Sequence, residues 1–221
     1  MTHRRRGWAV ALLAVGLLLL ACSDDDSATS TSTSSTTTAL TDTIAPDDPE
    51  LSARLITADD LPDGFAPTED VDTTITSFCA GQDAAAGLSA DGRAIVGFTR
   101  TPAGASVIEV VFRFEDDDAA QFVSQAEALL GSCSEVPDAT GLAFTYEPLS
   151  MPVAATLDGA ESSAGRVGTS VGSGDLVVEV AVVQQGDLGA LVAVLGLDQP
   201  RPELDALAAS TFSAAIEQLA A

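Results

Sequence analysis

Three charged side chains on predicted strands are the residues best placed to do chemistry. Glu109 and Arg113 lie in a predicted strand over residues 107–115, on the face opposite its alternating apolar residues. Glu179 lies in a second predicted strand, over residues 176–184, and would share that face. Arg113 would then bind a ligand carboxylate or phosphate, which a guanidinium holds through two parallel hydrogen bonds. The alternative is a surface ion pair worth less than about 1 kcal/mol. Both interpretations stay open, and the ligand-site hypothesis names these three residues.

An acidic run, Glu115–Asp118, is the second candidate for chemistry. Carboxylates are the oxygen ligands that calcium prefers, but the spaced Asp/Asn and Gly pattern of an EF-hand loop is missing. The run stands at the start of a predicted helix, where carboxylates cap free N–H groups and complement the helix dipole. The sequence therefore favours capping, and we predict no metal site.

The residue types that are missing exclude much catalysis. The chain has no Lys, and its single His is His3. After His3, the chain therefore has no residue for a Ser-His-Asp centre, a Cys-His centre or an imidazole metal ligand. It also has no lysine that could form a Schiff base. Paired carboxylates that cleave a glycosidic bond remain possible, because an acidic chain offers many candidates. We predict a protein that is not an enzyme and has no cofactor.

The first 21 residues have the composition of a secretory signal peptide. Arg4, Arg5 and Arg6 precede an apolar run from Gly7 to Leu20, and a small residue stands at the end. The run is shorter than the roughly 20 apolar residues of an ordinary membrane span. The segment Leu-Leu-Ala-Cys that ends at Cys22 resembles a bacterial lipobox. That resemblance implies cleavage before Cys22 and a diacylglyceryl anchor on its thiol, whereas the alternative is a plain secretory signal.

Removal of the leader makes the chain strongly acidic. Six Arg then face 33 Asp and Glu, which gives a net charge of −27. Such a surface repels nucleic acid, so we predict no nucleic-acid partner. The membrane would be a partner through the lipid anchor.

The remaining two cysteines form an even pair. Cys79 and Cys133 would be exposed to an oxidising exterior, where a disulfide is the default. The bridge would close a loop of about 55 residues and stabilise the fold by roughly 4 kcal/mol in the chain-entropy account. The alternative is a pair of buried thiols.

Composition divides the mature chain into a tether and one domain. Between Ser27 and Thr43, 13 of 17 residues are Ser or Thr, so residues 23–49 have too little apolar area to fold. Residues 50–221 have the length of a single domain.

Patterning within that domain predicts an α+β fold. We expect an antiparallel sheet of about five to seven strands with helices packed on one face. Helices are predicted over residues 51–61, 116–131 and 202–221, and strands over residues 93–100, 107–115, 142–147, 165–171, 176–184 and 188–197.

The order of these elements resembles that of a known family. The matching segments are Leu55–Pro62, the strand and helix from Val110 to Phe122, a cysteine after that helix, a late valine-rich hairpin and a C-terminal helix. Actinobacterial lipoproteins and the extracytoplasmic sensor domains of some actinobacterial serine/threonine kinases share this order. The resemblance covers roughly residues 50–221 and implies a sheet-and-helix domain whose cleft binds a small ligand. Those kinase domains usually carry two disulfides and this chain has cysteines for one, so no family binding residue is transferred.

The sequence thus predicts a membrane-anchored extracytoplasmic lipoprotein. Its domain would bind a small ligand or an envelope protein without catalysis. The alternatives are a carboxylate-dependent cell-wall hydrolase and a purely structural envelope protein.

Overall fold

A computed structural model describes most of the predicted domain. The described residues are 47–69, 71, 77–78, 82–101, 104–115, 118–134, 143–151 and 159–221. The predicted leader, Cys22 and almost all of the predicted tether lie outside them. Within the described residues, no helix is long and apolar enough to cross a membrane.

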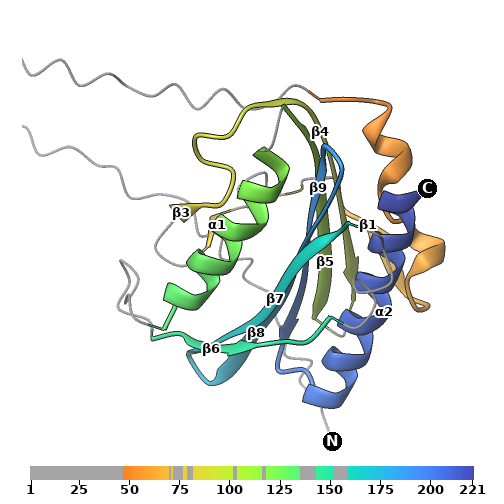
Figure 1. Ribbon diagram of the computed structural model, residues 1–221. Helices are drawn as coiled ribbons and strands as arrows, with labels where there is room; N and C mark the ends of the chain where they lie inside the picture. The colour runs from red at the N-terminus through yellow and green to blue at the C-terminus, as the bar shows by residue number, and fades with distance from the viewer. Residues whose placement is uncertain are drawn as a thin grey trace, which may run out of the picture. The chain divides into compact units, whose positions relative to one another are not determined.

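Seven strands form one antiparallel sheet (Figure 1). Their order across the sheet is β1-β4-β5-β9-β8-β7-β6. Of the four neighbouring pairs inside the sheet, three consist of strands that follow one another in the chain, namely β4–β5, β7–β8 and β8–β9. A positive φ of 63° at Gly186 forms the tight turn between β8 and β9, which confirms the predicted hairpin there. The strands are β1 Phe65–Pro67, β4 Ala90–Arg100, β5 Ala105–Phe114, β6 Thr145–Pro148, β7 Glu161–Val171, β8 Gly174–Gln185 and β9 Leu188–Leu197; β2 Ser77–Phe78 and β3 Gln82–Asp83 form a separate pair.

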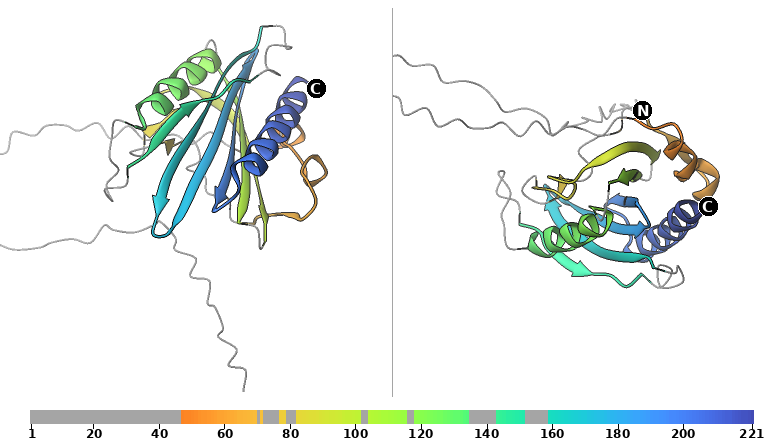
Figure 2. Two further views of the ribbon diagram at one scale, coloured as in Figure 1. Left: turned by 90° about the horizontal axis from the view of Figure 1, so that it is seen from below. Right: turned by 45° about the horizontal axis from the view of Figure 1, so that its top comes forward.

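The two long helices pack on opposite faces of the sheet (Figure 2). Helix α1, Asp118–Ser132, covers the face that carries Phe112 and Phe114, and α2, Arg201–Ala220, covers the face that carries Val107 and Val111. The α+β class and the antiparallel sheet are confirmed, but the structure differs from the expected packing of the helices on one face. The reason is that β8 and β9 are apolar on both faces, and both faces must be covered.

Helix α1 contributes an aromatic cluster to its side of the core. Phe122 is fully buried, and its ring centroid lies 5.7 Å from that of Phe112 and 5.2 Å from that of Phe114. At the first turn, the Asp118 carboxylate accepts a hydrogen bond from the Ser89 backbone N–H at 2.7 Å. Asp116 and Asp117 lie outside the described residues. Among the residues that the structure describes, no cluster of acidic, His or Cys side chains has the arrangement of a metal site.

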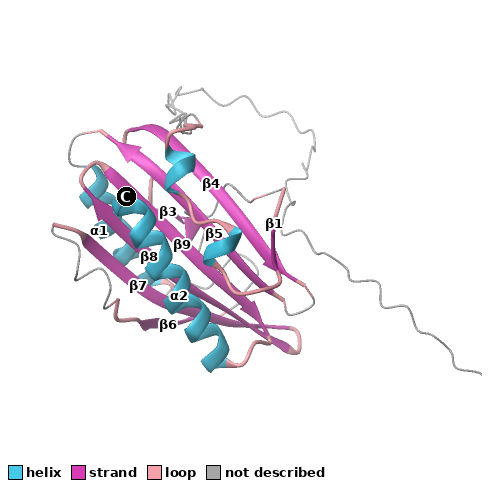
Figure 3. Cartoon of the chain, turned by 90° about the vertical axis from the view of Figure 1, so that its right-hand side faces the viewer, coloured by secondary structure: helices cyan, strands magenta, loops and turns pink. Residues whose placement is uncertain are grey.

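Helix α2 lies across one face of the sheet in Figure 3. Its expected apolar stripe is confirmed. All eight residues predicted for that face are buried against the sheet: Leu204, Leu207, Ala208, Thr211, Phe212, Ala215, Ile216 and Leu219.

The predicted helix over residues 51–61 is instead two 3-10 turns, η1 Leu51–Arg54 and η2 Ala58–Asp60. Extended backbone at Leu55 separates them. The Ile56 N–H donates to Glu109, and the Thr57 N–H donates to the Asp60 carboxylate. These donors are therefore not available for the hydrogen bonds of a continuous α-helix.

Candidate functional site

Glu109 is completely buried beneath the η1–η2 segment. Its Oε2 accepts the Ile56 N–H at 2.7 Å, whereas Oε1 has no hydrogen-bond partner among the described residues. Burial raises the pKa of Glu109 to about 7, opposed by the Ile56 hydrogen bond and increased further by the charge of Asp60. Glu109 therefore holds a connecting segment, and no ligand can reach it without displacing that segment.

Arg113 fastens the first described residues to the sheet. Its Nη1 lies 2.5 Å from Asp48 Oδ2, and its Nη2 lies 3.6 Å from the Glu50 carboxylate. The Glu50 N–H also donates to Asp48, and together with Arg113 it lowers the pKa of Asp48. The Asp48 N–H donates to the Arg93 carbonyl at 2.7 Å. The Arg113 guanidinium thus forms ion pairs within the protein.

Glu179 belongs to a row of three charged residues across neighbouring strands. Glu147 of β6 lies opposite Arg166 of β7, and Arg166 lies opposite Glu179 of β8. The Glu179 side chain is only 3% exposed and pairs with the Arg166 guanidinium. Burial raises the pKa of Glu179, and Asp205 adds to that effect, while the pairing with Arg166 opposes it.

Two residues of α2 complete this charged cluster. Asp205 pairs with Arg166, and Arg201 pairs with Glu147. Hydrogen bonds from Arg166 and then Arg201 lower the pKa of Glu147. The cluster of Glu147, Arg166, Glu179, Arg201 and Asp205 therefore joins the start of α2 to the outer strands of the sheet.

A hollow lies beside this cluster, on the α2 side of strands β6, β7 and β8. Two adjoining cavities of about 440 and 260 Å³ share Thr145, Gly168, Asp175 and Val177 as lining residues. We call them together the β6–β8 pocket. The larger one is also lined by Tyr146, Glu147, Arg166, Gln199, Arg201 and Leu204.

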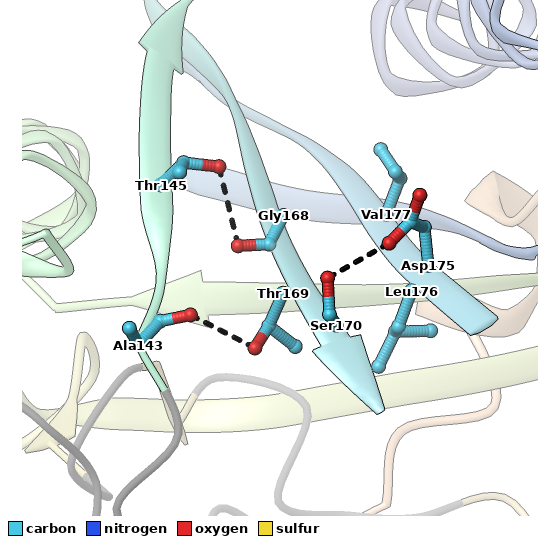
Figure 4. Close-up of a pocket in the computed structure, with 8 residues that line it drawn as sticks. All are labelled: Ala143, Thr145, Gly168, Thr169, Ser170, Asp175, Leu176 and Val177. Atoms are coloured by element: carbon cyan, nitrogen blue, oxygen red, sulfur yellow. Dashed lines mark hydrogen bonds between the residues drawn. The ribbon is translucent and has the colours of Figure 1, made fainter. Parts of the chain in front are cut away.

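Asp175, four residues along β8 from Glu179, provides a carboxylate to the β6–β8 pocket. Figure 4 shows it beside Ser170. Its Oδ1 accepts the Ser170 hydroxyl at 2.8 Å, and its N–H donates to Asp198 at 2.9 Å. Asp198 adopts a positive φ of 54°, and its two carboxylate oxygens lie 2.9 Å from the position that a Cβ at Gly174 would take. In the part of the chain that the structure describes, no arginine forms an ion pair with Asp175.

The three side chains predicted for a ligand site share a sheet face but do not meet. Glu109 and Glu179 lie on strands two positions apart in the sheet, about 10 Å by strand spacing. Arg113 lies four residues along β5 from Glu109, about 13 Å. Helix α2 and the η1–η2 segment cover the face between them. Only Glu179 adjoins the β6–β8 pocket, through Arg166.

Sequence reasoning missed Glu147, Arg166, Arg201 and Asp205. The available signal was the β7–β8 hairpin itself, since its turn places Arg166 opposite Glu179. Predicting that Glu147 lies opposite Arg166 requires the register of β6 against β7. No tight turn joins these two strands, so the sequence does not reveal that register.

The predicted disulfide stays a prediction. Cys133 is buried just after α1 and is 1% exposed. Cys79 lies outside the described residues, as does Cys22.

Comparison with known proteins shows a similar fold but assigns the chain to no family. No protein-family model matches the chain, and no curated protein sequence matches it. The extracellular domain of PknH from Mycobacterium tuberculosis is similar in structure, with a TM-score of 0.54, 14% identity, and coverage of 78% of this chain and 98% of that domain.

Two further solved structures are more distant. An uncharacterized protein from Mycobacterium smegmatis has a TM-score of 0.40 and 15% identity, with coverage of 73% of this chain and 79% of that one. The Saccharomyces cerevisiae Ran-binding protein Mog1p has a TM-score of 0.32 and 11% identity, with coverage of 72% and 82%. By its TM-score of 0.54, the chain is similar in fold to the PknH extracellular domain.

Proposed function

We propose that this protein is an extracytoplasmic binding domain, anchored to the membrane by lipid on Cys22, and that the β6–β8 pocket is its ligand site. The observation that carries the proposal is the pocket itself. It has the volume of a small-molecule site and combines apolar walls at Val177 and Leu204 with a few charged groups.

The fold and the leader support the same function. The PknH domain that shares this fold is an extracellular one, and residues 1–21 have the pattern of an export signal. A binding role also agrees with the arrangement of the charged cluster, in which the carboxylates are paired with arginine and are not free to act as acid and base.

A screen of envelope metabolites by thermal shift would test this function. The informative variant is Gly168→Val, because the added side chain projects from β7 into the pocket toward the Thr145 hydroxyl, 3.0 Å from the new Cβ. We expect at least one compound to raise the Tm of the wild type and to lose that effect in Gly168→Val.

A control variant and a second pocket variant separate binding from stability. Arg93→Gln removes an ion pair with Asp47 far from the pocket and should keep the ligand response. Arg201→Gln changes an exposed pocket residue without adding bulk, in case Gly168→Val fails to fold. The proposal fails if every compound that shifts the Tm does so equally in wild type and both pocket variants.

A further inference from the structure

Arg166, at the centre of the charged cluster beside the β6–β8 pocket, is not the residue that recognises a ligand. Arg166 uses four of its five N–H groups within the protein, two on Glu179 and one each on Glu147 and Asp205. Its side chain is 11% exposed. An incoming anion would therefore have to break these bonds, so we assign Arg166 to the structure of the pocket wall.

Arg201, in contrast to Arg166, is exposed and makes few hydrogen bonds within the described residues. It is 60% exposed, and among the described residues its one ion-pair partner is Glu147, which is itself 53% exposed. Most of its N–H groups thus remain available, and a guanidinium suits the two oxygens of a carboxylate. This end of the pocket can accept a carboxylate group.

Asp175 offers the complementary charge. Its carboxylate is exposed, lines both adjoining cavities, and has a neutral hydroxyl as its side-chain partner. The pocket therefore presents an available cation at one end and an available anion at the other. A ligand with a carboxylate and an ammonium group matches both.

The distance between these two ends indicates the size of that ligand. Arg201 pairs with Glu147, in the row that contains Glu179, and Asp175 lies four residues along β8 from Glu179. Glu147 lies two strands from β8, about 10 Å, and four strand residues span about 13 Å, so the Cα atoms of Glu147 and Asp175 lie about 16 Å apart, and the side chains shorten the gap. An extended chain covers about 3.4 Å per residue, so a tripeptide spans about 10 Å.

We propose that the β6–β8 pocket binds a short peptide with free ends, the C-terminal carboxylate at Arg201 and the N-terminal ammonium at Asp175. This inference rests on the proposed function of the pocket. Gly168 and Val177 lie between the two ends and leave room for small side chains on the peptide.

Calorimetric titration of the mature chain in detergent with trialanine tests this proposal. The comparison peptides are N-acetylated trialanine, trialanine amide and the doubly blocked form. We expect each single block to weaken binding at least tenfold and the double block to abolish it. Arg201→Gln should weaken trialanine at least tenfold and remove the effect of amidation. Asp175→Asn should do the same for acetylation.

Arg93→Gln is the matched control and should bind trialanine as the wild type does. Equal binding of free and doubly blocked trialanine would overturn the peptide proposal. If trialanine does not bind while the metabolite screen yields a ligand that Gly168→Val excludes, the peptide proposal fails and the proposed function stands. If neither yields a ligand, both fail.

Discussion

Glu109 makes the stability of this domain depend on pH in a direction that can be measured. The perturbation is Glu109→Gln, which keeps a side-chain oxygen for the Ile56 N–H and removes the ionisable group. Because the native pKa is about 7 and the ordinary value is 4.5, the native state holds a proton that the unfolded chain has lost between those two pH values. The native state binds more protons there, so stability falls as pH rises.

The magnitude follows from the difference between the two pKa values. A separation of about 2.5 units, at 1.36 kcal/mol each, corresponds to roughly 3 kcal/mol. The contribution of protonated Glu109 is fully present below about pH 4.5 and is lost as pH rises through about 7. Glu109→Gln has no such pH dependence. As pH rises from about 4.5 to above 7, its free energy of unfolding relative to that of the wild type should therefore increase by about 3 kcal/mol.

Urea denaturation of both proteins between pH 4.5 and 8.5 would measure the effect. The difference in free energy of unfolding cancels the other titrating groups, which are common to both. Glu161→Gln changes an exposed glutamate and should follow the wild type at every pH. A constant difference between wild type and Glu109→Gln across the range would show that Glu109 titrates normally, and would refute this account of its burial.

Three further predictions concern the anchor, the disulfide and the core. Cys22→Ser should move the protein from the membrane to the soluble fraction, since two acyl chains give stable attachment, and an unchanged distribution would contradict the lipobox prediction. Peptide mapping without reductant should find Cys79 joined to Cys133, with a lower Tm after reduction; labelling of both thiols in native protein would contradict it. Phe122→Ala should cost about 3–5 kcal/mol by chemical denaturation, because the ring is fully buried between two other phenylalanines.

Most of the fold was predictable because its signals are local. The α2 stripe follows from helical spacing alone, and the β8–β9 hairpin follows from two apolar runs joined by a turn at Gly186 and Asp187. The second helical layer was not predicted, although β5 carries Val107 and Val111 on the face opposite its phenylalanines. Glu109 between them suggested a solvent-exposed face, and only the Ile56 N–H, 53 residues away, explains how a carboxyl can be buried there.

The candidate site was less predictable, for a different reason. Strand registers bring Glu147, Arg166 and Glu179 into one row, and the start of α2 then adds Arg201. Each of these residues is unremarkable in its own segment. Their proximity depends on pairings between segments, which patterns within one segment do not specify.

The ion pair between Arg113 and Asp48 has a mechanical consequence. If the preceding chain is tethered to a membrane, tension on the domain enters at Asp47 and Asp48. There the load is shared by a backbone hydrogen bond to β4 and by a salt bridge that reaches across to β5. Pulling would therefore be resisted first by this clamp and only afterwards by the packing of η1 against the sheet. In a force experiment, Arg113→Gln should lower the force at which the first segment detaches while the force that unfolds the sheet stays the same.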